Sequence, residues 1–139
     1  MQNEASKEVT GGCLCGALRF VVGGQPYRVG LCHCLACRKH HGAPFHASAV
    51  FPQQAVTLTQ GKPGEHEGWA FCTLCGGSVF AQSCDEIEVH LGALDAPDQF
   101  QPTYELWTCR REAWLSPVPG ARQYERNRTS SGRSEAPTL

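Results

Sequence analysis

The chain has 139 residues, 41% of them hydrophobic, with 15 glycines and 9 prolines. This length suits one domain with its own core, and the glycine and proline content favours short strands and tight loops over a helical bundle. The formal net charge of −1 excludes a surface that attracts polyanions as a whole, so we expect no nucleic-acid partner. Without an apolar run of about 20 residues or a signal-peptide core, we expect a cytoplasmic protein with no membrane contact.

Short strands dominate the predicted elements. Residues 1–10 are expected to be a flexible lead-in, residues 11–124 the folded domain, and residues 125–139 a loosely held polar tail. Alternating or apolar runs predict strands at 17–22, 27–31, 45–51, 56–58, 65–71, 78–81, 86–91 and 104–108. One helical turn is expected at 35–41, ended by a glycine, and Trp114 with Leu115 is expected to anchor the end of the fold.

Nine cysteines are the most informative feature of the composition. Disulfide frameworks are typical of oxidising compartments, whereas short paired spacings in a reducing compartment favour metal binding. Seven of the cysteines stand in three clusters: Cys13/Cys15, Cys32/Cys34/Cys37 and Cys72/Cys75. The other two, Cys84 and Cys109, stand alone and are interpreted as small apolar residues or spare thiols.

The clustered thiols can be divided between metal sites in more than one way. The two separated pairs add up to one tetrahedral four-sulfur site, and the triplet then forms a three-sulfur site. The competing division is a zinc ribbon of Cys34 and Cys37 with Cys72 and Cys75, which leaves three clustered thiols unused. Spacing favours the first division, and an iron–sulfur centre is a further alternative. Zinc is preferred because C-x-C and C-x-x-C are ordinary zinc-chelating motifs.

Short motifs around the cysteines occur in a distinctive order. They are Gly11-Gly12-Cys13-Leu14-Cys15-Gly16, Cys32-His33-Cys34-x-x-Cys37-Arg38, Phe71-Cys72-x-x-Cys75-Gly76, Gly92-x-Leu94-Asp95, Pro102 and Trp114-Leu115. Over roughly residues 10–124 this order resembles the glutathione-dependent formaldehyde-activating enzyme family, which shares its domain with centromere protein V. The resemblance implies a mainly β, Mss4-like zinc-binding fold of small sheets with short helical turns.

The resemblance also implies the roles of the two sets of thiols. It assigns a structural zinc to Cys13, Cys15, Cys72 and Cys75, and a catalytic zinc to Cys32, Cys34 and Cys37, which makes two zinc ions per chain. The family joins formaldehyde to glutathione to give S-hydroxymethylglutathione, which is a carbon–sulfur lyase reaction in reverse. We therefore expect a carbon–sulfur lyase-type enzyme whose partner is a small thiol such as glutathione. The alternatives are a non-catalytic, zinc-stabilised binding module and a purely structural zinc ribbon.

Two positions depart from the family pattern. Glu105 stands where the family commonly has a histidine, and Trp69 stands where a basic residue is frequent. Both changes remove positive charge that would favour the binding of an anionic thiol. The resemblance therefore supports the metal site more strongly than it supports glutathione as the substrate. We interpret Glu105 as a surface carboxylate rather than a general base. Arg38 and Lys39 suit an anion-binding role and a solvated pair about equally.

Four histidines lie near the central cysteine cluster. His33 stands between two candidate ligands, and alternation along the backbone predicts that it points away from the metal. His40, His41 and His46 are of a type that can move protons in a pocket near neutral pH. We interpret them instead as half-exposed polar residues.

Overall fold

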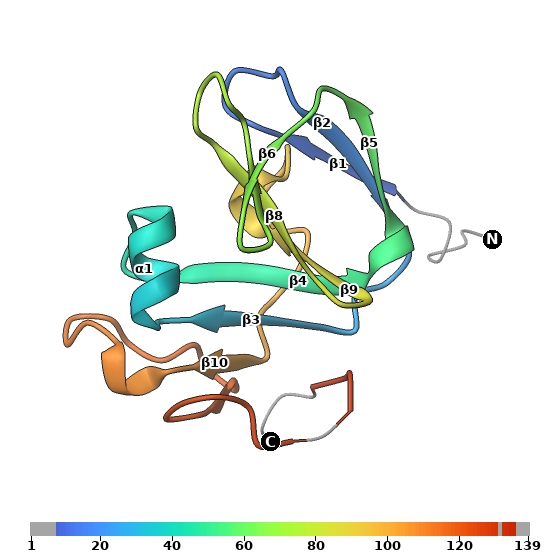
Figure 1. Ribbon diagram of the computed structural model, residues 1–139. Helices are drawn as coiled ribbons and strands as arrows, with labels where there is room; N and C mark the ends of the chain where they lie inside the picture. Colours follow the sequence, from blue (N-terminus) through green and yellow to red (C-terminus); the bar gives the residue numbers. More distant parts are fainter. Residues whose placement is uncertain (1–7, 131, 136–139) are drawn as a thin grey trace. The chain divides into compact units, whose positions relative to one another are not determined.

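The computed structural model describes residues 8–130 and 132–135 (Figure 1). The chain divides into two compact units, each built from two stretches of sequence. Among the described residues, the first unit contains residues 8–26 and 50–99, and the second contains residues 27–49, 100–130 and 132–135. Strands are the main elements and helices are few and short, which confirms the mainly β prediction. In the part of the chain that the structure describes, no helix has the length and apolarity to span a membrane.

The first unit contains a three-stranded antiparallel sheet. Its order is β1 (Glu8–Gly12), β2 (Arg19–Gly23) and β5 (Val56–Gln60). Phe20 and Val22 are buried and their β2 neighbours are less so, as the alternation predicts. The strand β1 begins at Glu8, inside the stretch expected to be a lead-in, because Glu8–Gly12 pairs with the whole of β2. Residues 1–7 of that lead-in lie outside the described residues.

Four further strands of the first unit neighbour one another in the order β9, β8, β7, β6. Their bounds are β6 (Gly64–His66), β7 (Trp69–Phe71), β8 (Ser78–Ser83) and β9 (Glu86–His90). The short 3-10 helices η2 (Gln53–Ala55) and η3 (Leu91–Ala93) precede and follow strands of this unit. The core includes Phe20, which meets the ring of Phe80 edge-on with the centroids 5.8 Å apart.

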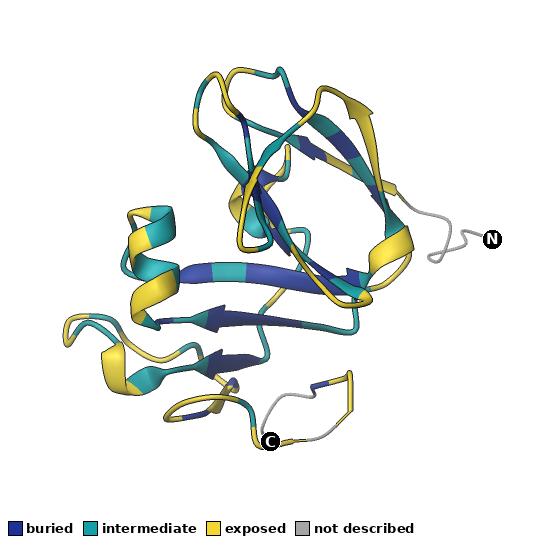
Figure 2. Ribbon diagram, viewed as in Figure 1, coloured by how far each residue is buried: buried dark blue, intermediate teal, exposed yellow. Residues whose placement is uncertain are grey.

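The second unit holds the strands around the central cysteine cluster. Its elements are β3 (Arg28–Cys32), α1 (Leu35–His41), β4 (His46–Pro52, whose last three residues belong to the first unit), β10 (Tyr104–Leu106), η4 (Thr108–Arg110) and β11 (Arg122–Gln123). The strand order is β11, β10, β3, β4, and β10 runs parallel to both β11 and β3. Figure 2 shows β3 and β10 largely buried, while α1 is intermediate or exposed along its whole length.

Two expectations about side chains of the second unit are wrong. His46 is expected to be a half-exposed polar residue, but it is only 7% exposed, and most residues of its strand β4 are buried. Trp114 was expected to anchor the fold, yet it is 69% exposed. Its segment is held by hydrogen bonds instead, since the Val118 backbone N–H donates to the carboxylate of Glu105.

Residues near the end of the described part of the chain are held by hydrogen bonds. Glu135 is buried, and its carboxylate accepts hydrogen bonds from the Tyr124 hydroxyl (2.6 Å) and from Arg128 Nε (3.1 Å). The Thr103 hydroxyl donates to the Glu135 carbonyl at 2.6 Å. The expectation of a loose tail over 125–139 therefore does not hold as far as Glu135, and residues 131 and 136–139 lie outside the described part.

Candidate functional site

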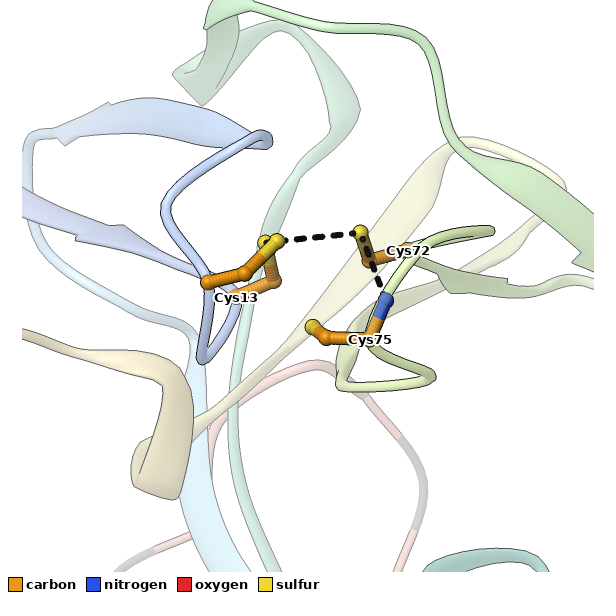
Figure 3. A group of neighbouring side chains, drawn as sticks. Cys13, Cys72 and Cys75 are labelled. Atoms are coloured by element: carbon orange, nitrogen blue, oxygen red, sulfur yellow. Dashed lines mark hydrogen bonds between the residues drawn. The ribbon is translucent and has the colours of Figure 1, made fainter.

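Four cysteine sulfurs converge in the first unit, and we call them the four-cysteine group. Cys13 and Cys15 follow β1, Cys72 and Cys75 follow β7, and all four sulfurs lie within 4.8 Å of one another. The Cys15 sulfur is 3.7 Å from those of both Cys13 and Cys72. Zinc bonded to four sulfurs at about 2.3 Å places the sulfurs about 3.8 Å apart, so the group has the dimensions of a tetrahedral zinc site. Figure 3 shows Cys13, Cys72 and Cys75 directed toward one another from two loops.

Backbone amides surround these sulfurs. The Leu18 N–H points at the Cys13 sulfur at 3.2 Å, and the Leu74 and Cys75 N–H groups point at the Cys72 sulfur at 3.4 Å. Gly76 makes the second loop possible because its φ of 80° is one that other residues rarely adopt. Desolvation opposes ionisation of Cys13, but the Leu18 amide and the neighbouring thiols lower its pKa to about 6. The thiolate of Cys13, which is the metal-binding form, is therefore favoured. At Cys15 the Ala17 amide acts in the same direction, but burial and the sulfurs of Cys72 and Cys13 outweigh it and raise the pKa of Cys15 to about 11.

Three cysteine sulfurs converge in the second unit, and we call them the three-cysteine group. Cys32 ends β3, Cys34 caps the start of α1, and Cys37 lies in the first turn of that helix. The three sulfurs lie within 4.8 Å of one another, and the Cys37 N–H donates to the Cys34 sulfur at 3.3 Å. The pKa of Cys37 is raised mainly by its hydrogen bond with the Cys32 sulfur and, to a lesser extent, by burial. Sulfurs that compete for protons in this way are well placed to exchange them for a cation.

Both groups fit zinc by the chemistry of their donors, since thiolates are preferred zinc ligands. Cys72 and Cys75 lie with Cys13 and Cys15. They are therefore not grouped with Cys34 and Cys37, as the alternative zinc ribbon requires. No fourth histidine, cysteine or carboxylate joins the three-cysteine group among the described residues. Cys84 and Cys109 are exposed and belong to neither group.

His33 lies between two members of the three-cysteine group but is not part of it. Its side chain is buried, and its Nε2 lies 2.8 Å from Oε1 of Glu105. Glu105 is 1% exposed, so its interpretation as a surface carboxylate is wrong. Burial opposes its ionisation, but hydrogen bonds from the Val118 N–H and His33 outweigh burial and lower its pKa. Glu105 is therefore a buried anion with its own set of donors.

Sequence reasoning missed the other side chains that bond to this carboxylate. Gln123 Nε2 donates to Glu105 at 3.1 Å, and Arg111 Nη2 donates at 3.2 Å. Gln123 reaches it because β10 and β11 pair in parallel, with Glu105 opposite Gln123. No local spacing signals that pairing, since β11 has only two residues.

The remaining histidines of this unit stack against one another. The rings of His41 and His46 are parallel within 9°, with centroids 4.0 Å apart, and His40 meets His41 edge-on at 4.7 Å. Burial is the main cause that lowers the pKa of His46 to about 3 and that of His41 to about 4. Repulsion by the positive charge of the neighbouring histidines lowers both values further. These two rings are therefore neutral near pH 7, and His46 is not the half-exposed residue expected.

The two basic residues after Cys37 have different surroundings. Arg38 donates to Glu112 at 2.7 Å and to the Pro44 carbonyl at 3.1 Å, so the chain's own groups hold its guanidinium. Lys39 is exposed and lines a groove of about 390 Å³ along α1. The other residues of the groove are Leu35, Arg38, Gly42, Ala43 and Pro44. Lys39 is thus the better candidate for contact with an anion.

Comparisons with known proteins identify a protein of similar fold and a matching family. A Rhodobacter sphaeroides protein of known crystal structure is 20% identical over 65% of this chain and 91% of its own, with a TM-score of 0.51, a similarity that concerns the fold. No curated protein gives a significant match. Residues 8–110, which include all seven clustered cysteines, match the family model of the glutathione-dependent formaldehyde-activating enzyme. The chain therefore belongs to the glutathione-dependent formaldehyde-activating enzyme family.

Proposed function

We propose that the protein is a zinc-dependent enzyme that makes or breaks the carbon–sulfur bond of a thiol adduct of a small carbonyl compound. Family membership supports a formaldehyde-activating activity in general, with glutathione as the thiol. The observation that carries the more specific proposal is the grouping of seven sulfurs into one set of four and one set of three.

In this proposal the four-cysteine group is structural. Four sulfurs complete the tetrahedral coordination of zinc, so such a site has no position for a substrate. The group also ties together loops that are far apart in sequence, since Cys15 and Cys72 are 57 residues apart. Its zinc would stabilise the first unit rather than take part in the reaction.

The three-cysteine group is the proposed reaction site. Zinc prefers four ligands, so a zinc held by Cys32, Cys34 and Cys37 would accept one from a substrate. When bound there, zinc would lower the pKa of a thiol and hold it as a thiolate. Three thiolates already donate much charge to the metal, which suits this site to a soft sulfur ligand better than to the activation of water.

The overall reaction is an addition. The thiol sulfur bonds to the carbonyl carbon, the electron pair of the carbon–oxygen double bond moves to oxygen, and oxygen gains the proton that the thiol loses. The reverse reaction breaks the same carbon–sulfur bond and returns the thiol and the carbonyl compound. No oxidant or reductant is required.

Glutathione is supported as the thiol by one feature of the second unit. It carries two carboxylates, and Lys39 presents an exposed ammonium on the same short helix as Cys37. Arg38 is a weaker candidate for binding a glutathione carboxylate, because its guanidinium already donates hydrogen bonds to Glu112 and to the Pro44 carbonyl. The prediction is that Lys39→Ala raises KM for glutathione more than KM for an uncharged thiol, by about fivefold at most, because an exposed ion pair is worth at most about 1 kcal/mol.

The activity is tested by exchange spectroscopy. We expect the zinc-loaded protein to speed up the exchange between free and glutathione-bound ¹³C-formaldehyde beyond the rate measured without protein. The matched control is Cys34→Ser, which keeps the four-cysteine group and is expected to lose the acceleration. Equal exchange rates with wild type, with Cys34→Ser and without protein, for glutathione and for uncharged thiols, would contradict the proposal.

A further inference from the structure

Glu105 and His33 form a buried pair in the second unit. Both residues are 1% exposed, and His33 Nε2 lies 2.8 Å from Glu105 Oε1. The His33 backbone N–H also donates to the Leu106 carbonyl at 3.0 Å. One short strand, β10, therefore holds both the backbone and the side chain of His33.

The carboxylate of Glu105 is surrounded by hydrogen-bond donors. Besides His33, it accepts from the Val118 N–H (2.7 Å), Gln123 Nε2 (3.1 Å) and Arg111 Nη2 (3.2 Å). An ionised carboxylate only accepts hydrogen bonds. His33 must therefore carry a hydrogen on Nε2 and donate a hydrogen bond to Glu105. A buried charge with this set of partners is costly to move, because each bond would have to be replaced.

The position of His33 gives this pair its importance. His33 is the single residue between Cys32 and Cys34, so a shift of its backbone displaces both cysteines. The sulfurs of the three-cysteine group must lie within one coordination sphere to share a zinc ion. We propose that Glu105 is a positioning residue, which fixes His33 and thereby sets the spacing of the Cys32 and Cys34 sulfurs. This inference rests on the proposed zinc site at the three-cysteine group.

The second unit offers a matched control for this carboxylate. Glu135 is also buried and also surrounded by donors, namely the Tyr124 hydroxyl, Arg128 and Arg122. None of these partners adjoins a clustered cysteine in the sequence. Replacement of either glutamate by glutamine leaves an amide NH₂ facing donors, so both variants test the loss of a buried acceptor.

The test compares Glu105→Gln with Glu135→Gln in the full-length, zinc-loaded protein. Zinc affinity of the three-cysteine group is measured by competition with a chromophoric chelator, and its geometry by the absorption bands of cobalt in place of zinc. We expect Glu105→Gln to weaken zinc binding about 10-fold or more and to change the cobalt bands. We expect Glu135→Gln to lower the melting temperature while leaving both metal readouts at wild-type values.

A second variant covers the case in which Glu105→Gln does not fold. His33→Phe keeps a ring against Phe45, whose centroid lies 5.7 Å from that of His33, but removes the donor to Glu105. His33→Phe is expected to weaken zinc binding as much as Glu105→Gln. The double variant is expected to bind zinc as tightly as His33→Phe alone, because Glu105 acts only through His33.

The possible failures can be told apart. If the wild-type three-cysteine group binds neither zinc nor cobalt, the proposed function is wrong and this inference falls with it. If the wild type binds metal but Glu105→Gln and His33→Phe leave its affinity and cobalt bands unchanged, only the inference is wrong. It is also overturned if Glu135→Gln alters the metal site as much, or if the effects of Glu105→Gln and His33→Phe multiply.

Discussion

The sulfur of Cys15 lies 3.7 Å from the sulfur of Cys72, although 57 residues separate them in the chain. Cys15 belongs to the loop between β1 and β2, and Cys72 to the loop between β7 and β8. A metal bound between them would crosslink two parts of the first unit that come from distant stretches of sequence. The two cysteine groups should therefore differ sharply in their effect on stability.

Loss of the four-cysteine group should unfold the protein. A structural zinc contributes about 10–16 kcal/mol of apparent folding free energy, and the whole net stability of a domain is about 5–15 kcal/mol. We expect Cys72→Ser to lose cooperative thermal unfolding by circular dichroism. Cys34→Ser should stay folded with one zinc ion and no activity, and the exposed Cys109→Ser serves as the control. Equal damage from Cys72→Ser and Cys34→Ser would contradict this division of roles.

Gly30 should tolerate no side chain. It lies opposite Tyr104 in the pairing of β3 with β10, and a Cβ added to it would lie 2.3 Å from Cζ of that ring. We expect Gly30→Ala to lower the free energy of unfolding by about 1–3 kcal/mol, because the buried ring has to shift. Gly23→Ala is the control, since a Cβ there meets no atom within 4 Å. Urea unfolding would reveal the difference, and equal stabilities of the two variants would refute the explanation.

Arg38 should act in stability rather than in substrate binding. Its guanidinium lies 2.7 Å from Glu112, and both side chains are about a third exposed or less (27% and 33%). A pair this exposed is worth at most about 1 kcal/mol. We expect Arg38→Ala and Glu112→Ala to lower stability non-additively in a double-mutant cycle. A rise in KM for glutathione in Arg38→Ala, without one in Glu112→Ala, would instead assign Arg38 to the substrate.

The buried histidine stack should make stability depend on pH. Burial lowers the pKa of His46 to about 3, so below its ordinary value of about 6.5 only the unfolded chain gains the proton. The free energy of unfolding should therefore fall as pH drops from about 6.5 toward 3. The slope is at most about 1.4 kcal/mol per pH unit for each such histidine, and His41, with a pKa of about 4, adds to it.

The variant His46→Phe isolates this contribution. Urea unfolding at pH 7.5 and at pH 5.5, with zinc in excess, should show a smaller pH difference in His46→Phe than in the wild type. The control is His66→Gln, because the side chain of His66 is 70% accessible. We expect the difference in unfolding free energy between the two pH values to be the same in His66→Gln as in the wild type. If the pH difference of His46→Phe matches that of the wild type, His46 does not contribute in this way.

Local patterns were sufficient to predict much of this fold. Alternation located β2 and β9, and an apolar run located β3, because these strands bury regular sets of side chains. The sulfur groups were predictable too, since C-x-C and C-x-x-C spacings place two thiols on one tight loop. The strand β1 was missed because its exposed start, Glu8-Val9-Thr10, shows no apolar alternation.

Long-range pairing of polar groups was not predictable. Glu105 and Glu135 are charged residues in segments with no distinctive pattern, yet each is buried by donors from distant positions. The donors to Glu105 come from positions 33, 111, 118 and 123. A charged residue without a local signal is expected on the surface, and only the tertiary structure reveals that its charge is compensated.

Thiol binding at the three-cysteine group is tested by titrating thiols into the full-length protein with cobalt in the three-cysteine group and zinc in the four-cysteine group. We expect glutathione to change the cobalt absorption bands in a saturable way, and Cys34→Ser to show no such change. Cobalt bands that stay constant with glutathione and with every other small thiol would show that the three-cysteine group does not bind the substrate thiol.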